Sequence, residues 1–138
     1  MAASRRVYAD TNIIIRYLTN DPPAQAEVVE RFLSHLGDRK SELFICDLVA
    51  AESVYVLQSF YRRPRAEIAD RLKAFFSLPG LVVQDRRIVY RALDLYVSHN
   101  IDFTDAYVAA SAQFNKVKEV LTFDSDFRAF DWLAIVEK

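Results

Sequence analysis

Val7-Tyr8-Ala9-Asp10-Thr11-Asn12 is a short apolar run that leads into an aspartate and two further polar residues. Such runs recur along the chain at residues 43–46, 81–83, 120–123 and 134–136. Four of the five lead into an aspartate, namely Asp10, Asp47, Asp85 and Asp124. Short apolar runs are typical of strands buried on both faces of a parallel sheet, and the carboxyl ends of such strands carry the sites of open α/β folds.

The longer stretches between these runs carry apolar residues at helical spacing, which gives each predicted helix one apolar face. The stripes are Ala24/Val28/Phe32/Leu36, Ile68/Leu72/Phe75/Phe76 and Ile88/Ala92/Leu95/Tyr96. This alternation predicts an α/β fold with a small, mainly parallel central sheet and helices on both faces. Because no repeat, low-complexity tract or linker interrupts the chain, we expect residues 1–138 to form a single domain.

Composition limits the classes of protein to which the chain can belong. The 138 residues are 52% apolar and carry a net charge of −1, so binding of nucleic acid by overall positive charge is excluded. A lone cysteine, Cys46, excludes an intramolecular disulfide and a cysteine-rich zinc site. No apolar run approaches the roughly 18 residues of a membrane span, so we expect a soluble, cytoplasmic protein with no membrane partner.

Two further carboxylates lie on predicted helix faces rather than after strands. Glu52 has apolar residues three and four positions away on both sides, which places it along an apolar stripe. Asp105 has Val108, Ala109 and Ala112 on its face. A desolvated carboxylate is costly unless a cation, a metal or a proton accompanies it. These two acids are therefore candidates for a functional site.

Each acid also has a structural explanation. Asp47 and Asp85 fit helix N-caps, because each precedes a plain helical stripe. Glu52 could instead pair with an arginine at the edge of the core, and Asp105 could be a first-turn acid that complements the helix dipole. Asp10 and Asp124 fit a cap less well, since each belongs to a denser polar cluster, and Asp126 lies close to Asp124 in the sequence.

These observations predict that Asp10, Glu52, Asp105 and Asp124, with Asp126 near, converge at one end of the sheet. Like charges at close range raise one another's pKa unless a divalent cation lies among them. Ligation by oxygen alone suits Mg²⁺ or Mn²⁺. Because an acidic cluster that holds such ions can hydrolyse a phosphodiester, the residues favour metal-dependent cleavage of nucleic acid.

Four motifs resemble those of the PIN-domain ribonucleases, and within them the VapC-type toxins of toxin–antitoxin pairs. They are Asp10-Thr11-Asn12, the segment 51–57 around Glu52, the segment 102–110 around Asp105, and the segment 121–127 with Asp124 and Asp126. They occur in order and span essentially the whole chain. The resemblance implies a PIN-like three-layer sandwich and an endoribonuclease that depends on Mg²⁺ or Mn²⁺. It also implies an RNA substrate, a small cognate antitoxin and a homodimer.

The resemblance further implies a role for each residue. Asp10 and Asp105 would bind the first metal, and Glu52 and Asp124 would bind through water or hold a second ion. Either Asp124 or Asp126 can be the fourth acid. Thr11, Asn12 and Thr122 would support the acids, with the two hydroxyl groups orienting Asp10.

Alternatives to this function remain open at this point. A catalytically silent PIN-like module that binds RNA or protein would share the fold. A phosphatase or phospho-receiver aspartate is disfavoured, since Asn12 stands where a dehalogenase-type site needs a second aspartate. Arginines at 62, 63 and 65 beside Tyr61, and at 86, 87 and 91, could hold RNA phosphates or simply be solvated.

Overall fold

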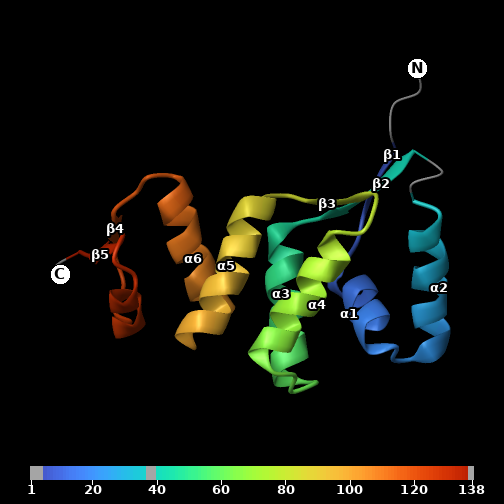
Figure 1. Ribbon diagram of the computed structural model, residues 1–138, viewed down its shortest axis with the longest axis horizontal. Coiled ribbons are helices and arrows are strands. Elements are labelled where there is room, and N and C mark those ends of the chain that lie inside the picture. The colour runs from blue at the N-terminus through green and yellow to red at the C-terminus, as the bar shows by residue number, and fades with distance from the viewer. Residues whose placement is uncertain (1–4, 37–39, 137–138) are drawn as a thin grey trace. The chain divides into compact units, whose positions relative to one another are not determined.

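The computed structural model describes residues 5–36 and 40–136, and the chain divides into two compact units (Figure 1). The first unit comprises residues 1–86 and the second residues 87–138. Each unit holds its own parallel strand ladder and its own helices. The five strands lie at the five apolar runs of the sequence, so the prediction of an α/β fold with parallel strands is confirmed.

The first unit is built on a three-stranded parallel sheet of order β1-β2-β3. Its strands are β1 (Arg5–Tyr8), β2 (Ser41–Ile45) and β3 (Leu81–Val83). The central strand β2 is buried at alternate positions and pairs with β1 on one side and β3 on the other. Parallel neighbours require crossover connections, and these are supplied by helices.

Four helices make those connections. They are α1 (Thr11–Thr19), α2 (Pro23–Ser34), α3 (Asp47–Ser59) and α4 (Arg65–Phe76). Pro23 is the first residue of α2, where its fixed φ angle already suits a helix. Proline has no backbone N–H, but an N–H at this position would have no partner within the helix, so nothing is lost. Ile14, Ile45, Leu72 and Phe76 are among the side chains that are fully buried in this unit.

The apolar stripe predicted for residues 24–36 is only partly confirmed, since Leu36, which follows α2, is buried but the members within α2 are not. Ala26 and Val29 are buried, whereas Val28 and Phe32 are 57% and 36% exposed. Val28 is two positions from Ala26 and adjacent to Val29, so it lies on a different side of the helix from these two buried residues. The sequence carries apolar residues on both sides of α2, and only packing decides which side is covered.

The second unit contains two helices, a two-stranded parallel ladder and a short 3₁₀ turn. Its elements are α5 (Arg86–His99), which begins at the last residue of the first unit, α6 (Phe103–Phe114), β4 (Glu119–Val120), η1 (Ser125–Ala129) and β5 (Ala134–Ile135). Arg91 joins α5 to α6 by a hydrogen bond from Nε to Gln113 Oε1 (3.1 Å). Trp132 Nε1 donates to the carbonyl of Ala109 (2.9 Å), which ties the last segment to α6.

Small side chains let α6 pack closely within its unit. Ala106, Ala109 and Ala110 are all fully buried. The aromatic rings of Tyr96 and Phe103 meet edge to face between α5 and α6, with ring centroids 6.2 Å apart. The predicted stripe of α5 is confirmed, since Ile88, Ala92, Leu95 and Tyr96 are buried. Across the described residues, every helix is too short or too polar to cross a membrane.

Gly80 tests the packing between α2 and the sheet. Its φ angle is +84°, and an added Cβ would lie 2.9 Å from Leu36 Cβ and 3.3 Å from the Ser41 carbonyl oxygen. We expect Gly80→Ala to lower the free energy of unfolding by about 1–3 kcal/mol, because alanine is strained at that φ and the neighbouring backbone cannot yield. Asn20→Gly is the control, since Asn20 also has a positive φ (55°) but glycine adopts it freely. Urea unfolding of both variants measures the difference, and equal midpoints would contradict the strain.

Candidate metal centre

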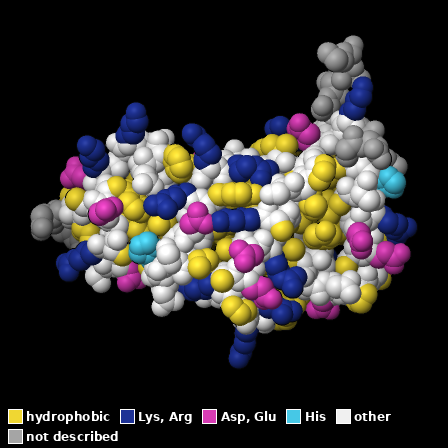
Figure 2. All heavy atoms as spheres, viewed as in Figure 1, with side chains coloured by type: hydrophobic (Ala, Val, Ile, Leu, Met, Phe, Trp, Pro, Cys, Tyr) yellow, Lys and Arg dark blue, Asp and Glu magenta, His cyan; other side chains and the backbone are white. Residues whose placement is uncertain are grey.

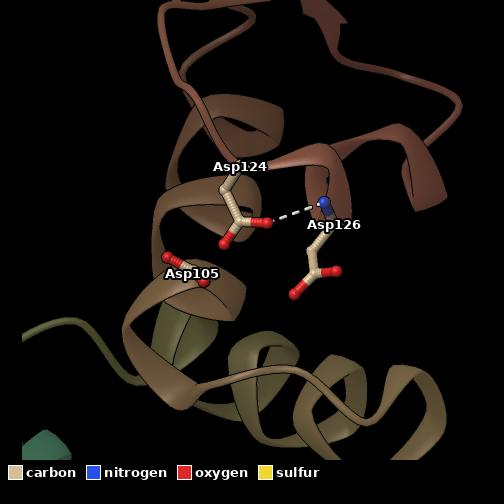
Figure 3. A group of neighbouring side chains, drawn as sticks. All are labelled: Asp105, Asp124 and Asp126. Carbon is tan, nitrogen blue, oxygen red and sulfur yellow. Dashed lines mark hydrogen bonds between the residues drawn. The ribbon is translucent and has the colours of Figure 1, made fainter.

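Three carboxylates come together in the second unit. Asp105 lies in the first turn of α6, and Asp124 and Asp126 lie at the start of η1. One ligand oxygen from each can be chosen so that all three lie within 4.8 Å of one another. Figure 3 shows the three side chains facing a common space between α6 and η1. Both aspartates of the fourth sequence motif therefore lie beside Asp105.

Asp124 is held in place by two short hydrogen bonds. Its Oδ1 accepts from the backbone amide of Asp126 (2.9 Å), so Asp124 caps η1. Its own amide donates to Thr122 Oγ1 (3.0 Å). In Figure 3 the second carboxylate oxygen of Asp124 points to the Asp105 side. The cap thus uses one oxygen and directs the other into the cluster.

Asp105 is the acid whose protonation is most affected by the fold. It is half-buried, whereas Asp124 and Asp126 are exposed. Burial raises the pKa of the Asp105 carboxyl, and the negative charges of Asp124, Asp102 and Asp126 raise it further. Each of these effects penalises the ionised form of Asp105. A cation among the three carboxylates would remove that penalty.

The donor set fits a hard divalent cation. All three side chains offer carboxylate oxygens, which Mg²⁺ and Mn²⁺ prefer, and neither histidine nor cysteine belongs to the group. Mg²⁺ needs only one or two carboxylates from the protein, because it retains several waters. Asp105 and the two η1 aspartates are therefore sufficient in kind and in number to hold one such ion.

The first unit carries the other two predicted acids. Asp10 occupies the N-cap position of α1, yet its side chain makes no capping hydrogen bond and is exposed. Thr11, which is buried, donates from Oγ1 to Glu52 Oε2 (2.9 Å). The hydroxyl of Thr11 thus orients Glu52, whereas the sequence predicted that it orients Asp10. Asn12 is exposed on α1.

Glu52 differs from its predicted environment. Its apolar neighbours on α3 are there, but Leu48 and Tyr55 are 79% and 69% exposed, and Glu52 is itself exposed. The predicted burial of Glu52 is therefore wrong for the first unit. Its alternative role is also absent, since no ion pair joins it to an arginine within residues 5–36 and 40–136.

Asp47 has a structural role that the sequence placed wrongly. Cys46, not Asp47, is the N-cap residue of α3. Asp47 Oδ1 accepts from the amide of Asp85 (3.0 Å), and the Asp47 amide donates to Gln84 Oε1 (3.1 Å). These bonds join the turns that follow β2 and β3. No sequence signal reveals them, because they exist only once the two strands are neighbours.

Most of the arginines considered for RNA binding have partners within their own unit. Arg86 donates to the carbonyls of Phe76 (2.7 Å) and Leu81 (3.3 Å), and Arg63 lies 3.9 Å from Glu67. The guanidinium groups of Arg87 and Arg91 lie over the rings of Phe114 and Trp132. These contacts favour the structural interpretation of the arginines at 86, 87 and 91.

Residues 7–133 match the PIN domain family. The chain belongs to that family. The match runs through both units and includes all five predicted acids. A VapC ribonuclease of Aquifex aeolicus is 24% identical over 119 residues, which cover 86% of this chain and 87% of that protein. A structure of VapBC2 from Rickettsia felis bound to a DNA fragment from their promoter is 15% identical, covers 95% of this chain and 97% of that chain, and has a TM-score of 0.39.

The comparisons confirm the resemblance to VapC-type PIN-domain proteins that the four motifs indicated. The structure groups Asp105, Asp124 and Asp126 in the second unit, and it joins Thr11 to Glu52 in the first. Convergence of all five acids stays a prediction.

The raised pKa of Asp105 predicts how stability depends on pH. A carboxyl whose pKa is higher in the folded than in the unfolded chain lowers stability once it ionises, so this contribution is relieved as the pH falls through the folded pKa. In metal-free buffer at neutral pH, Asp105→Asn should therefore melt at or above the temperature of the parent. The difference should disappear as the pH falls below 3.8, the ordinary value for aspartate.

Asp131→Asn is the matched control, because it removes one exposed carboxylate of the same unit from outside the cluster. Calorimetric melts of the parent and both variants, from neutral to acidic pH, measure the effect. If Asp105→Asn is less stable than Asp131→Asn at neutral pH, charge repulsion at Asp105 is refuted.

Proposed function

We propose that this protein is an endoribonuclease that depends on Mg²⁺ or Mn²⁺ and acts as the toxin of a toxin–antitoxin pair. The observation that carries the proposal is the cluster of carboxylate oxygens formed by Asp105, Asp124 and Asp126. This chain, which belongs to the PIN domain family, places all three acids within reach of one cation. The VapC ribonuclease relative supports RNA as the substrate. A divalent cation held by these carboxylates would offset the negative charge of the phosphodiester and activate a water molecule for attack on phosphorus.

The residues of the chain divide this work. Asp105 on α6 and Asp124 at η1 would hold the cation, and Asp126 would hold its hydration shell or bind it directly. Asp124 keeps its orientation through the cap on η1 and the contact with Thr122. Asp10 and Glu52 are proposed as the remaining catalytic acids, on the strength of their motifs. The capping site at Asp10 supports this, because the carboxylate is not used for capping.

The proposal also concerns partners. A small antitoxin encoded beside the gene would hold the protein inactive, in keeping with a relative of the VapC type. We further propose that the protein acts as a homodimer in the cytoplasm. Exposed apolar side chains such as Leu48 and Tyr55 on α3 are available for contacts with partners.

Metal dependence is tested by cleavage and by metal binding in parallel. The purified protein should cut a labelled RNA with Mg²⁺ or Mn²⁺ and stop when EDTA is added. Asp105→Asn and Asp126→Asn should each lower the cleavage rate by at least about 100-fold, because each removes a ligand of the cation. Mn²⁺ titration by calorimetry should show weaker binding in the same variants.

Asp131→Asn is again the control and should leave both readings unchanged. Cleavage that persists in EDTA, with protein shown to be free of other nucleases, would contradict the metal mechanism. RNA binding without any cleavage by the parent would instead establish the silent PIN-like module.

Thr11 provides a second test, directed at Glu52. Thr11→Val keeps the shape of the side chain but removes the hydroxyl that donates to Glu52 Oε2. We expect it to lower the cleavage rate by roughly 10- to 100-fold, the usual cost of losing a hydrogen bond that orients a metal-site ligand. Thr11→Ser restores the hydroxyl and should recover most of the rate. Equal rates for the valine and serine variants would show that the Thr11–Glu52 bond has no part in the reaction.

A further inference from the structure

A basic hollow lies in the first unit at the amino edge of the sheet. Its volume is about 420 Å³, and it is lined by Arg5, Val28, Arg31, Phe32, His35, Leu36 and Ser41. We call it the α2 hollow. Arg5 and Ser41 are the first residues of β1 and β2, and they are partners in the parallel register. The hollow therefore lies at the opposite end of β1 from Asp10, which follows that strand.

One wall of the α2 hollow is the exposed face of α2. Val28, Arg31, Phe32 and His35 lie at positions i, i+3, i+4 and i+7, so they share a side of the helix. This is the side that the apolar pattern placed in the core and that the structure leaves open, with Val28 57% and Phe32 36% exposed. The wall thus combines an accessible aromatic ring with cationic groups.

The cationic groups are available to bind a ligand. Arg5 and Arg31 make no side-chain hydrogen bond or ion pair with any residue in the ranges 5–36 and 40–136. Other arginines of this unit are engaged: Arg6 binds Glu42 (3.0 Å), Arg16 binds Gln25 (2.7 Å), and Arg71 lies 3.6 Å from Glu67. No acidic side chain is among the described residues that line the hollow. Among the described residues that line the hollow, the charged side chains are therefore all basic.

We propose that the α2 hollow binds a segment of single-stranded RNA. Arg5, Arg31 and His35 would contact its phosphates, and a base would lie on the ring of Phe32. A guanidinium group can donate two parallel hydrogen bonds to the oxygens of one phosphate, and a flat aromatic ring can stack on any base. An acidic peptide would satisfy the charges but would leave the exposed ring of Phe32 without a flat partner. This inference rests on the proposed function, because it concerns the substrate of the same protein.

The α2 hollow is too far from Asp10 to act on the bond that is cut. Five residues of extended chain separate Arg5 from Asp10, which is on the order of 16 Å at 3.3 Å per residue. The hollow would therefore strengthen the binding of RNA long enough to reach it and would leave short RNA unaffected. It would add affinity without changing the chemical step.

Binding is measured in EDTA, where cleavage does not complicate the reading. The probes are fluorescein-labelled oligouridylates of about 12 and about 4 nucleotides, lengths that bracket common single-strand sites. Arg5→Gln and Arg31→Gln should each weaken binding of the longer probe by about 3- to 10-fold. Each should also reduce the slope of log affinity against log salt by about 0.7 if one phosphate contact is lost.

Phe32→Ala should weaken binding by about 5-fold or more with the salt slope unchanged, because stacking releases no counterion. Arg71→Gln is the matched control, since it removes an exposed arginine of the same unit from outside the hollow. It should stay within about 2-fold of the parent. If Arg5→Gln and Arg31→Gln behave like Arg71→Gln with the longer probe, the proposal is overturned.

Two further readings separate the possible causes of failure. Cleavage of the shorter RNA with Mg²⁺ should be equal in the parent, Arg31→Gln and Arg71→Gln, so that loss of the hollow is distinguished from loss of the ribonuclease activity. Labelled polyglutamate is the second probe in EDTA. If Arg31→Gln weakens polyglutamate and not RNA, the hollow takes an acidic peptide and the RNA proposal is wrong.

Discussion

Parallel pairing of β1, β2 and β3 is the constraint on which the first unit depends. Because the three strands run in the same direction, every turn from strand to helix lies at one edge and every turn from helix to strand lies at the other. Asp10, Asp47 and Asp85 follow the strands at the carboxyl edge. The hydrogen bond from the Asp85 amide to Asp47 Oδ1 joins two of those turns directly. One edge of the sheet thereby becomes acidic.

The same constraint explains the composition of the opposite edge. Arg5 and Ser41 begin β1 and β2, and Gly80 immediately precedes β3. Gly80 allows Leu36 and the Ser41 carbonyl to approach closely. The α2 hollow opens at this edge, with its cations and its exposed aromatic wall. Figure 2 shows acidic and basic side chains interspersed over the face in view, as a net charge of −1 would suggest, whereas the described lining of the α2 hollow carries Arg5 and Arg31 and no carboxylate. Local charge, and not overall charge, is what a nucleic-acid substrate would meet.

In the second unit, the main physical constraint on the site is repulsion between the carboxylates of Asp105, Asp124 and Asp126. Asp105 is held half-buried beside Asp124 and Asp126, which raises its pKa and makes the cluster costly in the absence of a cation. The cap on η1 and the bond from the Asp124 amide to Thr122 Oγ1 keep Asp124 in that position. Structural hydrogen bonds therefore maintain an arrangement that electrostatics alone opposes, as is common at functional sites.

The sequence by itself determined the five strands and the parallel α/β class, because short apolar runs depend on near neighbours in the chain. It also predicted that Asp105 lies near Asp124 and Asp126, but from the polar motifs that these residues belong to and not from closeness in the chain. Tertiary structure alone decided three other features. It decided which apolar side of α2 is covered. It placed the Thr11 hydroxyl in a hydrogen bond with Glu52 and not with Asp10, and it made Asp47 accept a hydrogen bond that links two turns. Each of these depends on which elements pack together, and residues such as Thr11 and Glu52, 41 positions apart, carry no local signal of their contact.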